Sequence, residues 1–540
     1  MRRKLADALL VVAILLTVAL LYRKVTRLWW TWDDVFHLHI VAEHRLLDFF
    51  TSGALWLSIQ SQLFTPLLST TYKAELACFG PNPLPFYVVQ LIELAAVAVT
   101  LCFTLRLWMS RAAAASASFL FLTGTVVTVM ATQLDVMHYM HSALLSIGSA
   151  ALFAMALRRN RTLPGILSAA LYLLAMLSKE IAVPLAAVLV VLPERDLRAR
   201  VRAMWPHAIV LAVYFAWRYE MLGKLIGGYG WTFGPRDAQT LLLRTAWNIA
   251  RTFAGPRLAI GIPFVILVAC GILLRMRSRF AIAAVIVAFA VAIGPIVPVA
   301  VHYEHRFAWA AWICAAIVFA AGADTLRNRR MALAMMVAAP LFGLFVNRLQ
   351  WKSEFNLAKR MSDEGRVFTD LEGGDLLRMP AIPPGFMFQL AWFKEFMLHR
   401  AGGTMWFYDD LYLCSGAKPR RVFGFDEHTR QIREITAEIP AIAARYCASI
   451  RPNEPLALHF HFDNSRRLLT WNLGPYADGY TVVSGNGFLA YDVKRRDGLQ
   501  LFVEKGLAFR LRYRSLQGWV TYSPEFSLDL TRDQDLTWRR

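Results

Sequence analysis

Apolar residues occupy the first two thirds of the chain in long runs that short polar segments separate. Most runs contain roughly 15 to 20 residues, the length with which a helix crosses the hydrocarbon core of a membrane. The pattern therefore predicts an all-α polytopic membrane domain with about eleven transmembrane helices. The expected spans are Ala8–Tyr22, Pro85–Trp108, Ala112–Met130, Ser142–Leu157, Leu163–Leu177, Ile181–Leu192, Ala208–Leu222, Ile260–Leu274, Phe280–Val301, Phe307–Ala323 and Met331–Val346.

Beyond residue 350 the chain returns to the pattern of a soluble protein. Four stretches alternate apolar and polar residues at the two-residue period of a strand, with Gly or Asp turns between them. They are residues 456–463, 480–493, 499–515 and 518–530. The sequence thus divides into a membrane domain, residues 1–349, and a C-terminal α+β domain, residues 350–540. The second domain is β-rich toward its end, where we expect an antiparallel sheet or a small sandwich.

Composition indicates a membrane protein and argues against a nucleic-acid partner. Of the 540 residues, 57% are hydrophobic and 18% are charged, whereas soluble proteins are about half apolar and about a quarter charged. The formal net charge is +20, but many of the Lys and Arg residues lie in short loops between apolar runs. Basic residues in such loops fix orientation against the cytoplasmic leaflet, so we expect membrane lipids and not nucleic acid as partners.

The distribution of basic residues predicts the topology. Residues 163–192 could form one long helix or a hairpin, and both flanks are basic, with Arg158–Arg161 before and Arg195–Arg202 after. Only a hairpin keeps both clusters in the cytoplasm, and its turn falls at Lys179. The N-terminus is then cytoplasmic and the C-terminal domain extracytoplasmic, as in a multi-pass protein of a bacterial inner membrane.

This topology places the polar clusters on the outer side of the membrane. The cytoplasmic loops are too short to fold a nucleotide-binding domain, which excludes ATP-driven transport and the use of a cytosolic nucleotide-sugar. The first outer segment, residues 31–84, is long for a loop, and we expect interfacial helices in it. The other outer segments are residues 133–141, the Lys179 turn, 223–257, 302–306 and the chain after Asn347.

An acidic pair, Asp33-Asp34, follows the first span. In one interpretation Asp34 is the N-cap of a helix that starts at Val35. In the other, the pair supplies a general base at the membrane surface, where partial desolvation raises the basicity of a carboxylate. The residues alone leave both interpretations open.

The sequence contains no tight metal-ligand motif. His37, with His39 or Glu43, has helical spacing for metal ligands, but these residue types are common on surfaces. We therefore expect no cofactor, with a divalent metal as the alternative. The six Cys residues are not spaced like metal ligands; Cys414 and Cys447 share the C-terminal domain and could pair in an oxidising compartment.

Ionisable residues at two outer turns are candidates for substrate binding. Lys179 and Glu180 lie between apolar runs, where charges are costly and commonly functional. Alternatively they form a self-neutralising pair that reaches the interface. Arg306 follows His302 and Glu304 and is either an interfacial anchor or a cation for phosphate, whose oxygens suit the guanidinium fork.

Two further outer segments carry polar residues. Residues 223–257 are rich in Gly and basic, against the positive-inside trend, and an anionic ligand such as a lipid phosphate would explain Arg244 and its basic neighbours there. Within the second span, Glu93 is expected to be a structural acid paired with a neighbouring helix. The loop between the third and fourth spans has side chains that could contact a polar substrate: Gln133, Asp135, His138 and His141.

These motifs in this order resemble the glycosyltransferase-C superfamily, the polytopic enzymes that use polyprenyl-phosphate sugars. The resemblance is strongest for the protein O-mannosyltransferase-like branch and its bacterial relatives. It covers roughly residues 1–350 and rests on short motifs, whose order is more specific than any one of them. They are Asp33-Asp34, residues 64–94 (FTPLLSTTYKAELACFGPNPLPFYVVQLIEL), Leu177-Ser178-Lys179-Glu180 with Pro184, and Glu304-His305-Arg306.

The resemblance implies an enzyme that transfers a sugar, with inversion, from a polyprenyl-phosphate donor to an outer acceptor, which is a protein, a lipid or a glycan. Relatives often have Arg-Pro where this chain has Thr65-Pro66, so one expected cation is missing and basic residues of 223–257, such as Arg244, stand in for it. The roles that it implies are catalysis for Asp33 and then Asp34, and binding of the lipid phosphate for Arg306 and Lys179.

The alternative is a non-catalytic membrane protein, either a lipid or glycan transporter or an assembly scaffold. A transporter is expected to show inverted repeats and discontinuous helices near the middle of the membrane. The sequence shows no repeat, and its ionisable residues cluster at one face. These features favour the enzyme.

Overall fold

The computed structural model contains two compact units, Met1–Ser362 and Asp363–Arg540. The division falls within one long helix, α18 (Arg329–Arg366), which also contains the boundary expected at residue 349. The structure describes residues 2–59, 63–225, 238–366, 375–378, 405–407, 410–415, 420–426, 429, 431–451, 457–463, 468–471, 480–484, 489–492, 499–500, 508–514, 519–527, 529 and 532–539.

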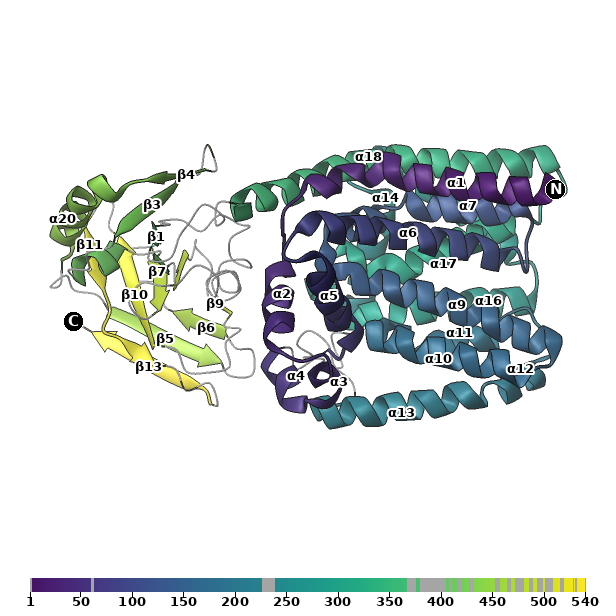
Figure 1. The fold of residues 1–540 in the computed structure, drawn as a ribbon, viewed down its shortest axis with the longest axis horizontal. Helices are drawn as coiled ribbons and strands as arrows, with labels where there is room; N and C mark the ends of the chain where they lie inside the picture. Colours follow the sequence, from purple (N-terminus) through teal and green to yellow (C-terminus); the bar gives the residue numbers. More distant parts are fainter. Residues whose placement is uncertain are drawn as a thin grey trace. The chain divides into compact units, whose positions relative to one another are not determined.

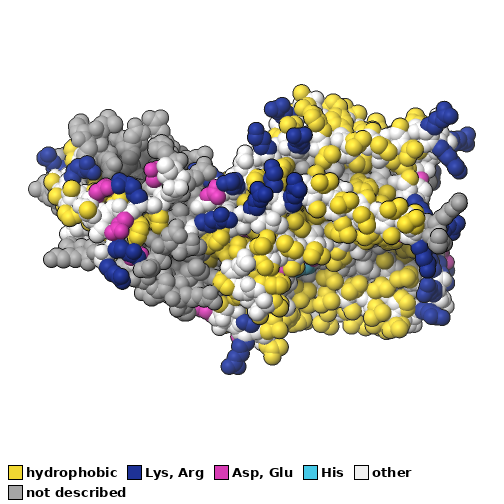
Figure 2. Space-filling view, turned by 45° about the horizontal axis from the view of Figure 1, so that its top comes forward, with side chains coloured by type: hydrophobic (Ala, Val, Ile, Leu, Met, Phe, Trp, Pro, Cys, Tyr) yellow, Lys and Arg dark blue, Asp and Glu magenta, His cyan; other side chains and the backbone are white. Residues whose placement is uncertain are grey.

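The first unit is a bundle of helices that run side by side (Figure 1). The face seen in Figure 2 is broadly apolar, with Lys and Arg side chains gathered toward the ends of the unit. Its helices include α1 (Arg2–Tyr22), α6 (Pro83–Leu105), α7 (Arg111–Leu122), α8 (Thr125–Thr132), α9 (Met137–Arg159), α10 (Thr162–Ser178), α11 (Leu185–Val190), α13 (Trp205–Leu222), α15 (Leu258–Arg275), α16 (Arg279–Ile293), α17 (Trp309–Ala323) and α18.

The helical unit has the character of a multi-pass membrane domain. Among the helices described, seven are long and apolar enough to cross a membrane, and α7 with α8 makes an eighth if the bent pair is one span. The helices α10 and α11 are apolar but shorter. The expected number of eleven spans is therefore not confirmed, because several apolar runs form helices that are too short or that break.

The bend between α7 and α8 is 57° and has a local cause. Gly124 separates the two helices, and a Cβ atom at this position would collide with the indole ring of Trp312. The Trp312 Nε1 donates to the carbonyl of Phe121 at 3.0 Å, and the Asn347 Nδ2 donates to the carbonyl of Gly124 at 3.2 Å. Side chains of other helices thus add hydrogen bonds to carbonyls at the break, which also accept from the backbone N–H groups of Gly124 and Val127.

The expected hairpin at Lys179 is confirmed. Helix α10 ends at Ser178, and α11 returns through the bundle toward the end at which α9 finishes. There the Arg158 Nε donates to the Glu194 carboxylate at 2.6 Å, and the Arg195 Nη1 donates to the Asn160 Oδ1 at 3.3 Å. The two basic clusters that flank the hairpin therefore lie at the same end of the bundle.

Residues 34–79 form four helices at the end of the bundle opposite the N-terminus (Figure 1). Helix α5 begins with Pro66 in its first turn, where a missing N–H is harmless, and stops at Gly80, whose φ of 64° suits glycine. The helical content expected of this segment is confirmed. The four helices are α2 (Asp34–Glu43), α3 (Asp48–Thr51), α4 (Gly53–Ile59) and α5 (Pro66–Phe79).

The segment 223–257, expected to be a Gly-rich loop, contains a helix instead. Helix α14 (Ala238–Ala254) is amphipathic: Thr245 and Thr252 are buried, while Leu243 and Trp247 are exposed. The loop expectation was wrong because the glycines precede the helix, and residues 238–254 by themselves have the 3.6-residue period of an amphipathic helix.

The second unit is α+β, as expected. One sheet is mixed, in the order β2-β1-β3-β4, and β1 pairs in parallel with both β2 and β3. Two further sheets are antiparallel, β11-β10-β7-β8 and β13-β5-β6-β9. The strands are β1 (Asp375–Arg378), β2 (Met405–Phe407), β3 (Arg421–Asp426), β4 (Gln431–Glu434), β5 (Ala457–Asp463), β6 (Leu468–Trp471), β7 (Tyr480–Ser484), β8 (Leu489–Asp492), β9 (Leu499–Gln500), β10 (Ala508–Arg514), β11 (Val520–Tyr522), β12 (Phe526–Ser527) and β13 (Gln534–Arg539).

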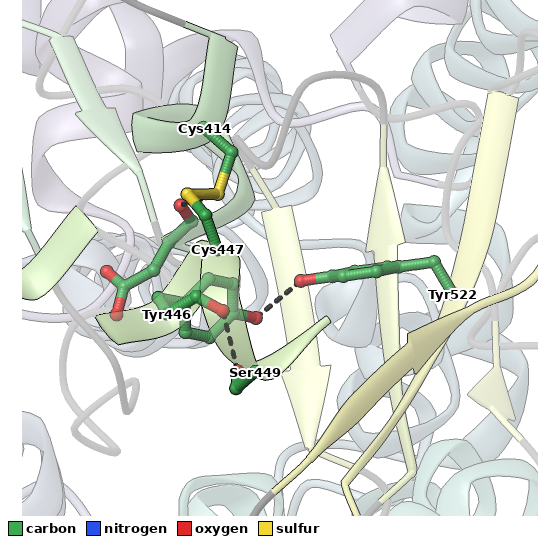
Figure 3. Close-up of a disulfide and its surroundings, with 6 residues drawn as sticks. Cys414, Tyr446, Cys447, Ser449 and Tyr522 are labelled. Carbon is green, nitrogen blue, oxygen red and sulfur yellow. Dashed lines mark hydrogen bonds between the residues drawn. A yellow bond between two sulfur atoms is a disulfide. The ribbon is translucent and has the colours of Figure 1, made fainter. Parts of the chain in front are cut away.

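A disulfide joins Cys414 to Cys447 in this unit (Figure 3). Helix α20 (Ile439–Ser449) carries Cys447, and the adjacent Tyr446 shares a hydrogen bond with the hydroxyl of Tyr522 on β11. The pairing considered from the sequence is confirmed. Disulfides persist mainly in oxidising compartments.

Candidate active site

The acidic pair lies in a tight turn where the chain enters α2. Asp34 is fully buried: its Oδ2 accepts from the backbone N–H of Thr31 at 2.7 Å, and its Oδ1 accepts from the Tyr72 hydroxyl at 2.9 Å. The helix begins at Asp34 and not at Val35, and the N-cap position belongs to Asp33. The capping interpretation was therefore wrong in detail, because the Asp34 side chain bonds backward to the turn and not to the helix.

The turn positions Asp33 differently from its neighbour. Trp32 has a φ of 48°, a left-handed conformation that is costly for a bulky residue. Asp33 is half-buried, and its side chain does not cap α2. The two hydrogen bonds to Asp34 stabilise this strained turn. The turn leaves the side chain of Asp33 half-buried.

Burial raises the pKa of Asp33 above the usual value for an aspartate. Arg306 lowers this pKa and Glu304 raises it, so both lie within electrostatic range of Asp33. Burial raises the pKa of Asp34 much further, and Asp135 adds to that rise. Asp33 is thus a carboxylate of increased basicity next to a guanidinium, whereas the bonding capacity of Asp34 is used by the turn.

Arg306 lies in the short helix η5 (His305–Ala308) and is held by two carboxylates. Its Nη1 is 3.1 Å from the Asp135 Oδ2, and its Nε is 2.9 Å from the Glu304 Oε2. The same Nη1 also donates to the Gln133 Oε1 at 3.4 Å. The arginine is therefore positioned from two sides at the outer turns.

Lys179 is 8% exposed, and its Nζ lies 4.8 Å from the centre of the Tyr139 ring. Burial, followed by repulsion from Arg306, lowers the pKa of Lys179 to about 7. The effect of Arg306 places the two cations near one another. Two neighbouring cations at a rim of carboxylates are suited to an anion such as phosphate.

Glu180 does not neutralise Lys179. Its Oε1 accepts from the backbone N–H of Phe64 at 2.7 Å and forms an ion pair with the buried Arg218. The self-neutralising interpretation of Lys179-Glu180 is therefore wrong. Glu180 ties the outer helices to α13.

Asp135, which the sequence indicated only as one of four possible contacts to a polar substrate, lies at the candidate site as a partner of Arg306. It is buried in η2 (Leu134–Val136), one of its oxygens contacts Arg306, and it lies within electrostatic range of Asp33. The signal was present in the polar run from Gln133 to His141. What the sequence could not show is that α9 begins here and points this run toward the acidic turn.

The remaining candidates differ in their positions. His138 is 8% exposed, and neither ring nitrogen has a hydrogen-bond partner within the part of the chain described. It lies within electrostatic range of Lys179 and Arg306. Glu304 is exposed and holds Arg306, while Arg244 is exposed on α14. The side chain of His302 lies outside the described residues.

The metal alternative finds no support at the acidic turn. Across the described ranges, no group of three or more His, Cys, Asp or Glu residues is arranged to hold a metal. His37 stacks on Tyr72 with ring centres 5.1 Å apart, and the His39 Nε2 lies 3.6 Å from the Glu43 carboxylate. These contacts explain the helical spacing of the three side chains without a metal.

A cavity of about 680 Å³ lies within the bundle, lined mainly by apolar side chains of α6, α9, α11, α16 and α17. Ile181 and Trp309, which follow Lys179 and Arg306 closely in the sequence, line it. Arg158 and Asp324, from the opposite end of the bundle, line it as well. The cavity therefore extends along the bundle and includes residues close in sequence to the two cations, although neither Lys179 nor Arg306 lines it.

Comparisons with known proteins give structural similarity without a match in sequence. No protein-family model matches the chain, and no curated protein sequence matches it. The structure is similar to that of the archaeal oligosaccharyltransferase AglB from Archaeoglobus fulgidus, in complex with an inhibitory peptide and a dolichol-phosphate. The TM-score is 0.48 at 10% sequence identity, over 88% of this chain and 75% of that one.

At this TM-score the similarity assigns no residue and no reaction. The function proposed below therefore rests on the side chains of this chain.

Proposed function

We propose that the protein is a membrane glycosyltransferase, which moves a sugar from a polyprenyl-phosphate donor to an acceptor on the extracytoplasmic face with inversion at the anomeric carbon. The observation that carries the proposal is the contrast within the acidic pair. The side chain of Asp34 is bound by Thr31 and Tyr72, whereas that of Asp33 does not cap α2, has a pKa raised by burial and lies within electrostatic range of Arg306. A base and a phosphate-binding cation are the two groups that this transfer requires.

In this mechanism Asp33 accepts the proton of the acceptor hydroxyl while the hydroxyl oxygen attacks the anomeric carbon. The bond between that carbon and the phosphate oxygen breaks on the opposite face, and the phosphate leaves with the electron pair. Arg306 and Lys179 stabilise the negative charge that develops on the phosphate. A separate general acid is unnecessary because the phosphate leaves as a stable anion.

The apolar cavity suits the lipid part of the donor. Its volume of about 680 Å³ and its apolar lining are appropriate for several isoprene units. It includes Ile181 and Trp309, which follow the two cations closely in the chain. A phosphate at Lys179 and Arg306 would thus have its hydrocarbon chain directed into the bundle.

The outer location of the site is supported by two features of the chain. The basic clusters at Arg158 and Arg195 lie together at one end of the bundle, which we assign to the cytoplasm. The disulfide between Cys414 and Cys447 favours an oxidising compartment for the second unit. Both are consistent with chemistry on the extracytoplasmic side, in an inner membrane if the protein is bacterial.

The test is transfer from radiolabelled polyprenyl-phosphate sugars to a membrane lipid and protein extract by the full-length protein. We expect Asp33→Asn to abolish transfer without reducing the amount of folded protein, since an amide cannot accept the proton. We expect Asp34→Asn to retain more activity but to reduce thermal stability, because it replaces one acceptor of the Thr31 and Tyr72 bonds.

Near-normal transfer by Asp33→Asn would contradict the catalytic assignment and return the pair to a structural role. Chelation of divalent metal is the second arm of the experiment. Loss of wild-type activity in EDTA, with recovery on adding Mg²⁺ or Mn²⁺, would show that the carboxylates act through a metal.

A further inference from the structure

A second buried acid, Glu75, has no part in the transfer mechanism above. It lies on α5, one turn after Tyr72, whose hydroxyl donates to Asp34. Glu75 is 6% exposed, and neither of its carboxylate oxygens has a hydrogen-bond partner among the described residues. A buried carboxylate without partners is costly, so its presence next to the catalytic turn requires an explanation.

A second acid, Glu93, lies within electrostatic range of Glu75 and does not compensate its charge. Burial and then the Glu93 carboxylate raise the pKa of Glu75 to about 8. Glu93 on α6 lies 3.2 Å from the His141 Nε2 on α9, which confirms that Glu93 pairs with a neighbouring helix. One imidazole cannot compensate two carboxylates, so this cluster has an excess of negative charge once both acids ionise.

Further polar atoms on α6, η2 and α9 are buried without a partner in the part of the chain that is described. They are the Gln90 Oε1, one turn from Glu93 on α6, the Asp135 Oδ1 and the Ser142 Oγ, adjacent to His141 on α9. A group that satisfies the two oxygens of Glu75 must itself supply donors.

Three kinds of group supply donors or positive charge here. A divalent metal does not fit, because no set of three ligands is found across the described ranges. Water or neutral hydroxyls would satisfy hydrogen bonds but would leave Glu75 mainly in its neutral, protonated form, because its pKa is raised to about 8. An ammonium group provides three donors together with a compensating charge.

We propose that Glu75, supported by the Glu93–His141 pair, binds a protonated primary amine on the sugar that the enzyme transfers. The inference rests on the proposed function and names its substrate class: an amino sugar linked to a polyprenyl phosphate. Glu75 lies one helical turn from Tyr72, whose hydroxyl donates to Asp34. An amine bound by Glu75 would therefore hold the sugar close to the acidic turn. A neutral sugar would leave the carboxylate unpaired, so the site selects against it.

The main experiment measures binding of two matched donors, decaprenyl-phosphate glucosamine and decaprenyl-phosphate glucose, to the purified full-length protein. The Asp33→Asn background prevents turnover. We expect the amino donor to bind at least tenfold more tightly than the neutral donor at pH 7. Adding Glu75→Gln to this background should remove the preference for the amino donor. The affinity for the neutral donor should stay unchanged. That unchanged affinity also serves as the control that the variant is folded. The matched control, Glu43→Gln on α2, should keep the preference.

Equal affinities for the two donors, or a preference that survives Glu75→Gln, would overturn the amine site. Binding of neither donor would instead contradict the proposed function. In that case a second measurement decides the amine site by itself.

That measurement is modification of Glu75 by dicyclohexylcarbodiimide in the wild-type protein, followed by mass spectrometry. The reagent is apolar and attacks protonated buried carboxyl groups, which suits an acid with a pKa of about 8. Methylammonium chloride should slow the modification severalfold relative to sodium chloride at the same ionic strength. Equal rates in the two salts would overturn the proposal and leave Glu75 solvated by water alone.

Discussion

At the scale of single residues, neighbours in the sequence have different roles here. Asp33 and Asp34 are adjacent, yet one is held by Thr31 and Tyr72 and the other is left at the edge of the cation cluster. Lys179 and Glu180 are likewise adjacent, but Glu180 pairs with Arg218. In both cases the contacts made across the fold, and not the residue type, separate a structural side chain from a candidate functional one.

We expect Arg306→Ala to weaken donor binding about ten- to a hundredfold, since one charge-assisted contact to phosphate contributes about 1.5 to 3 kcal/mol. Arg306→Lys keeps the charge but loses the fork and should weaken binding less. Titration of the purified variants with a polyprenyl-phosphate analogue measures both effects.

The contact of Arg306 with buried Asp135 requires a control, because Arg306→Ala leaves that carboxylate uncompensated. The double variant Arg306→Ala/Asp135→Asn should regain thermal stability without regaining donor affinity. Unchanged affinity in Arg306→Ala would remove this residue as the phosphate ligand and turn attention to Lys179 and Arg244.

Donor affinity should fall as the pH rises through about 7. Burial lowers the pKa of Lys179 to about 7, and only the charged amine, present below that pH, attracts the phosphate. A donor with a neutral sugar is used, because its phosphodiester keeps one negative charge across this range and the titration then belongs to the protein. Lys179→Arg should abolish the decline, because its guanidinium stays charged. Identical pH profiles for the wild type and Lys179→Arg would show that Lys179 does not contact the phosphate.

The acid side of the pH profile of transfer activity should depend on Asp33, whose pKa is raised by burial. Transfer requires the deprotonated carboxylate, so activity should decline on acidification at a pH above that of an ordinary aspartate.

At the scale of elements, the breaks between helices create the site. The hairpin turn after α10 presents Lys179, the 3-10 turn before α17 presents Arg306, and the turn before α2 presents Asp33. Regular helices between these breaks form the walls of the apolar cavity. The arrangement combines polar chemistry at helix ends with a lipid-compatible interior.

A bulky side chain in the cavity should interfere with long lipid chains only. Ala284 on α16 lines the cavity, whereas its neighbour Ala283 is exposed. We expect Ala284→Trp to weaken binding of a decaprenyl-phosphate donor by tenfold or more and to leave a short-chain prenyl donor little affected. Ala283→Trp, on the outer side of the same helix, should change neither. Equal loss for both chain lengths in Ala284→Trp would contradict a lipid-binding role for the cavity.

At the scale of the whole molecule, the chain combines an apolar helical unit with a disulfide-bonded α+β unit. Among the described helices, seven or eight are candidates to span a membrane, as in a multi-pass membrane protein. The disulfide adds an independent indication of compartment for the second unit.

Reporter fusions and thiol chemistry test the orientation together. A reporter that is active only outside the cytoplasm should work after Arg540 and be silent after Arg202. Alkylation of the denatured, unreduced protein should modify four cysteines, Cys78, Cys102, Cys270 and Cys314, and reduction should expose two more. The reverse reporter pattern, or six alkylated cysteines without reduction, would overturn the extracytoplasmic assignment.

The sequence by itself determined the membrane class, the basic ends of the hairpin, the helices of residues 34–79 and the strands near the C-terminus. These features follow from hydrophobic period, charge and turn residues, which act over a few neighbouring positions. It also identified Asp33, Lys179 and Arg306 as ionisable residues at outer turns, since charges between apolar runs are conspicuous.

Only the tertiary structure decided which of these groups meet. Asp135 joins the site because α9 starts beside α2, and Glu180 leaves it because α13 presents Arg218. The orphan carboxylate of Glu75 and the break at Gly124 are likewise visible only through their surroundings. Burial, ion pairing and steric contact depend on residues far apart in the chain, so no local pattern records them.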